Sequence, residues 1–218
     1  MKVSTLYIKS LSTMAAAVML VACGGGGDDS SNAAATPAPA TPTPTTCTPA
    51  VNAATGYAFV FKGCNGTVAE YFDKTECVRD NATGLIWEVK TASSLRAGSN
   101  IYTNFDSDIS KQKGPALPAP TITEISAIDN SVGYKNVVAR SNLCGFNNWR
   151  IPSKDELITL TTPGGVDSTW FPNTPLEPFW TSTESVFDVT LAIAVGFANG
   201  GTGDFVRSGK EHVRLVRK

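Results

Sequence analysis

Apolar and polar positions alternate over several short segments of the chain, a pattern typical of half-buried β-strands. The predicted strands are residues 57–61, 77–80, 85–89, 179–182, 191–197, 204–207 and 213–217. Residues 81–84, with the sequence Asn-Ala-Thr-Gly, separate the second and third of these segments. This composition is typical of a turn, so residues 77–89 are predicted to form a β-hairpin.

Two segments instead show helical features. Residues 130–142 can form a helix with its valines on one side. A second helix is predicted to begin at Ser153, because Ser153 and Glu156 have the spacing of a capping box. Its buried face consists of Leu157, Ile158 and Leu160. Many short strands with two helices predict an α+β fold with an antiparallel sheet, whereas residues 91–120 are predicted to be an irregular insertion.

The N-terminus has the features of a bacterial lipoprotein signal peptide over residues 1–22. Lys2 and Lys9 precede an apolar run, residues 14–22, which is too short to span a bilayer. The run ends in Leu-Val-Ala-Cys, the form of a lipobox, so Cys23 is predicted to carry acyl chains such as palmitate. Several acyl chains on one residue hold a protein stably in a membrane. Gly24, rather than Asp, favours the outer membrane of the cell envelope.

Residues 23–46 are predicted to form a disordered tether after the anchor. They contain a glycine run followed by prolines alternating with Ala and Thr, and such a segment has little apolar surface to bury. Its reach is up to roughly 70 Å, because proline-rich chains are extended. A proline-rich ligand for a partner domain is the alternative interpretation. Residues 47–218 remain as one globular domain of 172 residues.

The charge of the chain argues against nucleic acid as a partner. The formal charge is −1, and removal of Lys2 and Lys9 with the signal peptide makes it −3. Nucleic-acid-binding proteins are expected to have a basic surface. The membrane, reached through the lipid anchor, and a glycan or protein ligand are therefore the expected partners.

Four cysteines lie in the predicted globular domain: Cys47, Cys64, Cys77 and Cys144. The cell envelope is oxidising, so an even number of cysteines predicts two disulfides. Of the three pairings, we favour Cys47–Cys64, which closes a short loop, and Cys77–Cys144. A zinc site is disfavoured, because the chain has one histidine and no Cys-x-x-Cys pair. No cofactor and no metal ion are expected, and an EF-hand-like start at Asn104 lacks the required Gly and Glu.

Four blocks of sequence resemble the Lcl C-terminal domain family of bacteria. They are CVRDNATGLIWE at 77–88, LCGFNNWRIPSKDEL at 143–157, FWTST at 179–183 and VRLVR at 213–217. The resemblance implies a surface or envelope domain, and one member of the family is the terminal domain of a collagen-like adhesin. The resemblance also implies a fold similar to C-type lectins, by analogy alone. It supplies no catalytic residues.

Candidate ligand contacts lie between these blocks, because loops carry recognition more often than framework segments do. Residues 91–120 contain Tyr102 and Phe105, and residues 161–178 contain Trp170 and Phe171. If the fold is lectin-like, the two loops should gather on one side of the sheet. The tryptophans inside the blocks, Trp87, Trp149 and Trp180, are predicted to lie in the core.

The charged residues of the blocks are interpreted as structural. Arg79, Glu88, Arg150 and Arg214 are predicted to form an ion-pair network. His212 is predicted to lie on the surface at a strand end, without a nucleophile motif. The basic C-terminus, which includes Arg207 and Arg214, could bind anionic glycans if its residues share a face.

The sequence therefore predicts an envelope-anchored lipoprotein with a non-catalytic domain that binds carbohydrate or protein in an adhesion-type role. An envelope enzyme such as a hydrolase and a structural envelope protein are the alternatives.

Overall fold

The computed structural model describes residues 47–50, 53–108, 111 and 113–218. No helix in this part of the chain is long and apolar enough to cross a membrane. The predicted signal peptide, the lipid anchor at Cys23 and the tether up to residue 46 lie outside the described residues.

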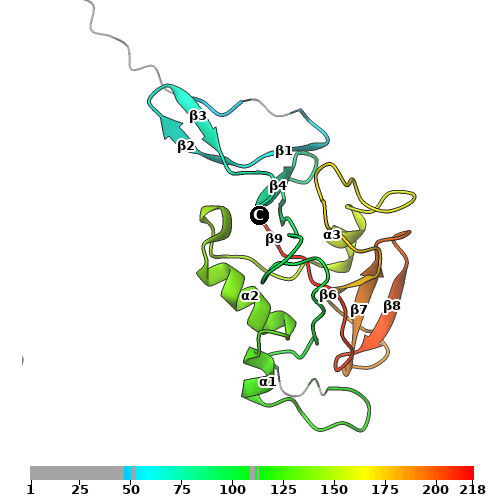
Figure 1. Ribbon diagram of the computed structural model, residues 1–218. Helices are drawn as coiled ribbons and strands as arrows, with labels where there is room; N and C mark the ends of the chain where they lie inside the picture. Colours follow the sequence, from blue (N-terminus) through cyan, green and yellow to red (C-terminus); the bar gives the residue numbers. More distant parts are fainter. Residues whose placement is uncertain (1–46, 51–52, 109–110, 112) are drawn as a thin grey trace, which may run out of the picture. The chain divides into compact units, whose positions relative to one another are not determined.

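The strands of the described residues form three antiparallel sheets, and their arrangement can be followed in Figure 1. The first has the order β1-β4-β5-β9, the second is the hairpin β2-β3, and the third has the order β6-β7-β8. The strands are β1 (Tyr57–Phe59), β2 (Phe61–Asn65), β3 (Val68–Tyr71), β4 (Cys77–Asp80), β5 (Ile86–Glu88), β6 (Pro178–Glu184), β7 (Leu191–Gly196), β8 (Thr202–Val206) and β9 (Val216–Arg217). The predicted hairpin is confirmed as β4-β5, with Val78 opposite Trp87. The strand predicted over residues 57–61 is instead divided at the buried Val60, and its second part pairs with β3.

In the described part of the chain, three α-helices accompany the sheets, so the fold is α+β: α1 (Ile122–Ser126), α2 (Ser131–Arg140) and α3 (Lys154–Ile158). A 3-10 helix, η1 (Leu143–Gly145), follows α2. The capping box at Ser153 is confirmed, because Ser153 Oγ accepts from the Glu156 amide and Glu156 caps Ser153 in return. The sequence analysis missed α1, although Thr121 and Glu124 form the same motif at its start.

The core consists of two clusters of buried side chains. One contains residues of α2, β5, β6 and β7, and the other contains residues of α3, β5, β6 and β7. The C-terminal segment runs between them: Val213 and Leu215 belong to the first cluster and Val216 to the second. Figure 1 shows this segment in red, between α2 and the β6-β7-β8 sheet. Trp87, Trp149 and Trp180 are buried in these clusters, as predicted.

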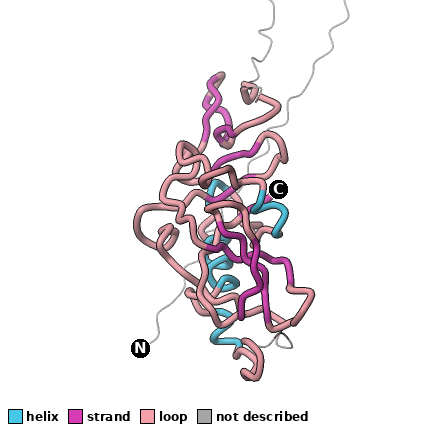
Figure 2. Tube along the Cα trace, turned by 90° about the vertical axis from the view of Figure 1, so that its right-hand side faces the viewer, coloured by secondary structure: helices cyan, strands magenta, loops and turns pink. Residues whose placement is uncertain are grey.

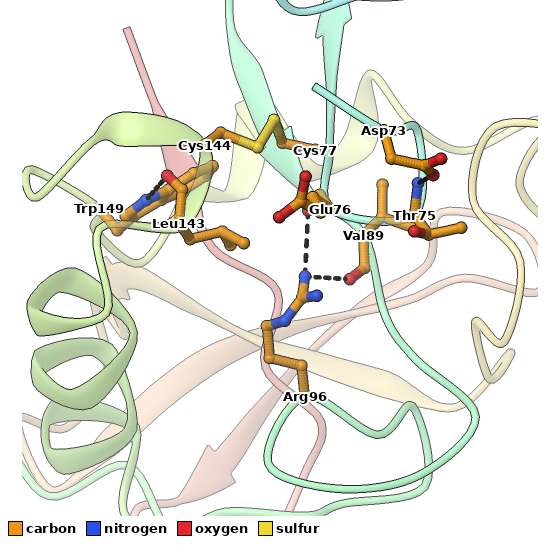
Figure 3. Close-up of a disulfide and its surroundings, with 9 residues drawn as sticks. All are labelled: Asp73, Thr75, Glu76, Cys77, Val89, Arg96, Leu143, Cys144 and Trp149. Carbon is orange, nitrogen blue, oxygen red and sulfur yellow. Dashed lines mark hydrogen bonds between the residues drawn. A yellow bond between two sulfur atoms is a disulfide. The ribbon is translucent and has the colours of Figure 1, made fainter. Parts of the chain in front are cut away.

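Long loops connect the short elements, as Figure 2 shows. Both predicted disulfides are confirmed: Cys47–Cys64, with a sequence separation of 17, and Cys77–Cys144, with a separation of 67. The second links β4 to η1 (Figure 3). Beside it, Arg96 Nη1 donates to the carbonyl oxygens of Glu76 (3.1 Å) and Val89 (3.0 Å), which ties the loop after β5 to the framework.

Candidate functional site

A hollow lined by aromatic rings lies where β1, the end of β3 and the segment before β6 meet. We call it the aromatic cleft; its volume is about 410 Å³. The lining residues are Ala50, Ala53, Tyr57, Ala58, Phe59, Tyr71, Asn81 and Trp170. Tyr57 and Phe59 are two positions apart on β1 and therefore point to the same side of the strand. Trp170, predicted as a ligand contact, thus lies beside rings that the sequence analysis did not select.

The four rings hold one another in defined orientations. The centroid of Trp170 lies 5.6 Å from that of Phe59, with an interplanar angle of 70°, and 6.3 Å from that of Tyr57. Phe59 lies 6.4 Å from Tyr71. Such tilted and edge-on pairs are the preferred geometry of aromatic rings. Phe59 is 47% exposed, and the other three rings are half-buried, so the cleft presents a pre-organised aromatic surface.

Two polar groups accompany the rings. Asn81 Oδ1 is buried and has no hydrogen-bond partner in the described part of the chain. An unsatisfied buried acceptor costs about 1–3 kcal/mol, and because this oxygen has almost no accessible surface, it is not open to a ligand in the cleft. Burial raises the pKa of Tyr57 to about 12, with a further contribution from the charge of Asp80. The Tyr57 hydroxyl is therefore neutral near pH 7. None of the lining residues is charged.

The other three predicted contacts have little exposed surface, so none of them presents an open aromatic face, and their contact with a ligand stays a prediction. Phe171 is 1% exposed, Tyr102 3% and Phe105 7%. Phe171 packs edge-on against Tyr57 at 4.9 Å, beneath the cleft.

Tyr102 and Phe105 are buried because the segment that carries them is not a surface insertion. The ring of Tyr102 packs on Tyr134, and Trp180 Nε1 donates to the Tyr102 carbonyl at 2.6 Å. The side chain of Asn130 binds both the amide and the carbonyl of Phe105, at 2.7 and 3.1 Å. These long-range contacts draw the segment into the core.

The two loops expected to gather on one side do meet, at a second cavity of about 590 Å³. Its lining includes Thr91, Gly98 and Ser99 from the first loop and Gly164, Asn173 and Thr174 from the second. At the closest approach, a Cβ at Gly98 would lie 1.7 Å from the Asn173 carbonyl oxygen, so only glycine fits there. The loops are thus in contact, but through backbone and small side chains.

Beneath this cavity lies a cluster of fully buried charges. Lys90 Nζ lies 3.1 Å from Glu88 Oε1 and donates to the Tyr134 hydroxyl at 3.0 Å. Arg214 donates to the Glu88 carbonyl oxygen and, at 2.6 Å, to Thr174 Oγ1. Burial lowers the pKa of Lys90 to about 8 and that of Arg214 to about 10. Of the predicted network, Glu88 forms a buried ion pair, but with Lys90, whereas Arg214 lies beside it and bonds to the main-chain carbonyl of Glu88 rather than to its carboxylate.

The remaining members of the predicted network lie elsewhere. Arg150 binds Glu156 through two nitrogens, at 2.7 and 2.6 Å. Arg79 has no ion pair within 4 Å among the residues that the structure describes.

One further prediction about the C-terminal region is wrong. His212 is buried rather than on the surface, since its ring packs on Phe179 and its Nδ1 lies 3.0 Å from the Asn100 carbonyl oxygen. Burial also lowers the pKa of His212. Arg207 and Arg214 are 3% and 0% exposed, so they cannot contribute side chains to a basic surface. In the described residues, no group of three or more His, Cys, Asp or Glu side chains could hold a metal ion.

Together these features define a disulfide-linked α+β domain with buried ion pairs and an aromatic cleft. The model of the Lcl C-terminal domain family matches residues 76–217, and the chain belongs to this family. No sequence among the curated proteins matches the chain. The family region starts after β3, so most of the cleft, including Tyr57, Phe59 and Tyr71, lies before it.

Proposed function

We propose that this chain is a lipid-anchored envelope protein whose domain binds carbohydrate without catalysing a reaction, and that the aromatic cleft is the binding site. The observation that carries the proposal is the set of pre-organised rings that line one hollow, of which Phe59 is 47% exposed. The apolar faces of sugar rings stack on aromatic side chains. Trp170 and Phe59 would stack on the sugar.

The chemistry of the lining supports binding rather than hydrolysis. Glycoside hydrolysis needs two carboxyl groups about 5–10 Å apart across the scissile bond. The residues around the cleft are aromatic, aliphatic or amide side chains. The resemblance of the motif blocks to an adhesin domain points the same way, and the lipobox before Cys23 supports the anchor.

A glycan array tests the proposal. The mature chain with Cys23→Ser lacks the acylation site and can be purified without detergent. We expect saccharides to bind this chain, and we expect Trp170→Ala and Phe59→Ala each to weaken binding at least tenfold, because buried aromatic contacts dominate binding energies.

Phe187→Ala is the matched control, because Phe187 is 83% exposed and lies outside the cleft. It should leave binding unchanged. Thermal melting of every variant shows that the domain is folded. An array without bound saccharides, or equal binding by the Trp170→Ala chain, contradicts the proposal.

Mass spectrometry of the mature N-terminus tests the anchor separately. We expect acyl chains on Cys23 and release of the Cys23→Ser chain from membranes. An unmodified Cys23, or cleavage at another residue, contradicts the lipoprotein assignment.

A further inference from the structure

A third hollow is lined mainly by polar side chains and shares no residue with the aromatic cleft or with the cavity between the two loops. We call it the polar pocket; its volume is about 320 Å³. Its walls come from the segment 104–107, the start of α2, the motif residues Arg150 and Ile151, β6, and the residue after β8. The side chains used below are those of Asn104, Asp106, Ser131, Lys135, Thr181 and Arg207.

The floor of the polar pocket consists of buried polar groups that hydrogen bonds hold in place. Ser131 Oγ donates to Asn104 Oδ1 at 2.6 Å, and Thr181 Oγ1 donates to the Ile193 carbonyl oxygen at 2.7 Å. Arg207 is 3% exposed and donates to the carbonyl oxygens of Asn104 and Val189, at 3.2 and 3.1 Å. Ser131 Oγ keeps lone pairs that can accept from a ligand, and Thr181 Oγ1, which also accepts from the Thr183 amide at 3.1 Å, keeps one. The floor is thus rigid and suited to hydroxyl groups.

The negative charges at the polar pocket are already engaged. Lys111 bridges Asp106, at 3.0 Å, and Glu184. Arg207 Nη1 lies 3.9 Å from Asp106 Oδ2. Burial acts to raise the pKa of Asp106, but the Asp108 amide, Lys111 and Arg207 together lower it. Asp106 is therefore ionised near pH 7, and Lys111 and Arg207 balance its negative charge. It is thus poorly suited to bind a further cation.

One positive charge remains uncompensated among the lining residues and their ion-pair partners. This set contains four positive and three negative side chains. The positive ones are Lys111, Lys135, Arg150 and Arg207, and the negative ones are Asp106, Glu156 and Glu184. Glu156 neutralises Arg150 through a two-nitrogen contact. Lys135 is half-exposed, and no carboxylate of the described residues lies within 4 Å of its Nζ.

We propose that the polar pocket binds the carboxylate group of a small hydroxylated acid, such as a sugar acid. Lys135 pairs with the carboxylate, and the hydroxyl groups of the ligand bind the side chains of the floor. The single uncompensated charge matches a monoanion, whereas a phosphate monoester carries about −1.5 to −2 at pH 7. A pocket of this volume is at the small end of ligand sites, which suits one sugar unit. This site is independent of the aromatic cleft.

Calorimetric titration of the mature Cys23→Ser chain with D-glucuronate and with D-glucose tests the proposal, since the two probes differ in one carboxylate. We expect glucuronate to bind at least tenfold more tightly and the preference to fall as salt rises. Lys135→Gln should abolish the preference, and Lys135→Glu should eliminate glucuronate binding by repulsion. Lys62→Gln makes the same charge change on the exposed lysine of β2 and should have no effect.

The Trp170→Ala variant shows whether the polar pocket binds its ligand independently of the aromatic cleft. It should leave glucuronate binding unchanged, while Lys135→Gln should leave saccharide binding at the aromatic cleft unchanged. Equal affinities for glucuronate and glucose, no binding of either, or loss of glucuronate binding in Trp170→Ala would each overturn the polar-pocket proposal. Thermal melting of the Lys135 variants checks that they are folded.

Discussion

Two regions of this chain use aromatic residues in opposite ways. In the family region, residues 76–217, Trp87, Trp149 and Trp180 are at most 3% exposed and form the core. In the preceding region, residues 53–73, Tyr57, Tyr71 and Phe61 are half-exposed and Phe59 is 47% exposed. The family region therefore supplies nearly all of the core, to which Val60 also belongs. The preceding region adds most of an aromatic surface to one edge of it through the pairing of β1 with β4, and Trp170 of the family region completes that surface.

The two regions also differ in how they treat charge. The family region buries Glu88, Lys90 and Arg214 completely, and Glu88 Oε2 accepts from the Leu215 amide at 2.9 Å. In the preceding region, Lys62 is exposed and Glu70 is partly exposed. Buried charges must be paired because water no longer solvates them, so the stability of the domain should depend on the family region far more than on residues 53–73.

The largest effect expected from this comparison is that of Glu88→Ala. It leaves Lys90 buried without its carboxylate and the Leu215 amide without its acceptor, and breaking a buried pair from one side costs about 3–5 kcal/mol. We expect a loss at the upper end, about 5 kcal/mol, in urea unfolding. Glu70→Ala on β3 is the control and should change the unfolding free energy by less than about 0.5 kcal/mol. Similar losses in the two variants would contradict the comparison.

Removal of each disulfide compares how much the family region and the preceding region contribute to the stability of the domain. Replacing Cys77 and Cys144 with Ala opens a loop with a separation of 67 residues, for which the chain model gives about 4 kcal/mol. Replacing Cys47 and Cys64 would cost about 3 kcal/mol in the same model if both regions unfolded together.

Because Cys64 lies in the β2-β3 hairpin, outside the core clusters, we expect that second pair of substitutions to change the main unfolding transition by less than about 1 kcal/mol. Differential scanning calorimetry measures both losses. Equal losses would show that the two regions unfold as one unit.

The titration of Lys90 should have a smaller effect than Glu88→Ala or the loss of the Cys77–Cys144 disulfide. Its pKa is about 8 in the folded protein, lowered by burial, and about 10.5 in the unfolded chain. Between these values the unfolded chain binds more protons, so stability rises with pH. Below pH 8 both states are protonated and this contribution is constant.

We expect an increase of about 1.5 kcal/mol in the unfolding free energy from pH 8 to pH 9.5, before the tyrosines of the unfolded chain ionise. Urea unfolding at several pH values measures it. The Lys90→Met chain should lose this dependence, although it is less stable throughout. A stability that falls over this range would contradict the assignment of the titration to Lys90.

Much of the secondary structure could be predicted because it depends on near neighbours in the chain. The turn at residues 81–84 and the cap at Ser153 follow from a few adjacent residues. The helix α1 was missed although Thr121 and Glu124 carry the same signal. The β2-β3 hairpin was also missed, because its two short strands lack a strong alternating pattern and contain Gly63.

The candidate sites were less predictable, since exposure is a property of long-range packing. Phe171 and Trp170 are adjacent, yet one lies beneath the cleft and the other lines it. The shared position of Tyr57 and Phe59 could have been predicted, because residues two positions apart on a strand point to the same side. Nothing local indicated that Asn81 would have a buried, unpaired oxygen.

The sequence by itself determined the features that need only local or pairwise chemistry. These are the α+β class, the family, the two disulfide pairs, the helix cap and, as a prediction, the lipid anchor at Cys23. Only the tertiary structure decided which polar residues are buried. Arg214 lies 126 positions after Glu88, and its charge, like those of Glu88 and Lys90, would suit the surface. The pairing of β5 with the C-terminal segment brings all three together inside the domain. The free energy of a charge depends on which groups surround it, and that is fixed only when distant segments pack.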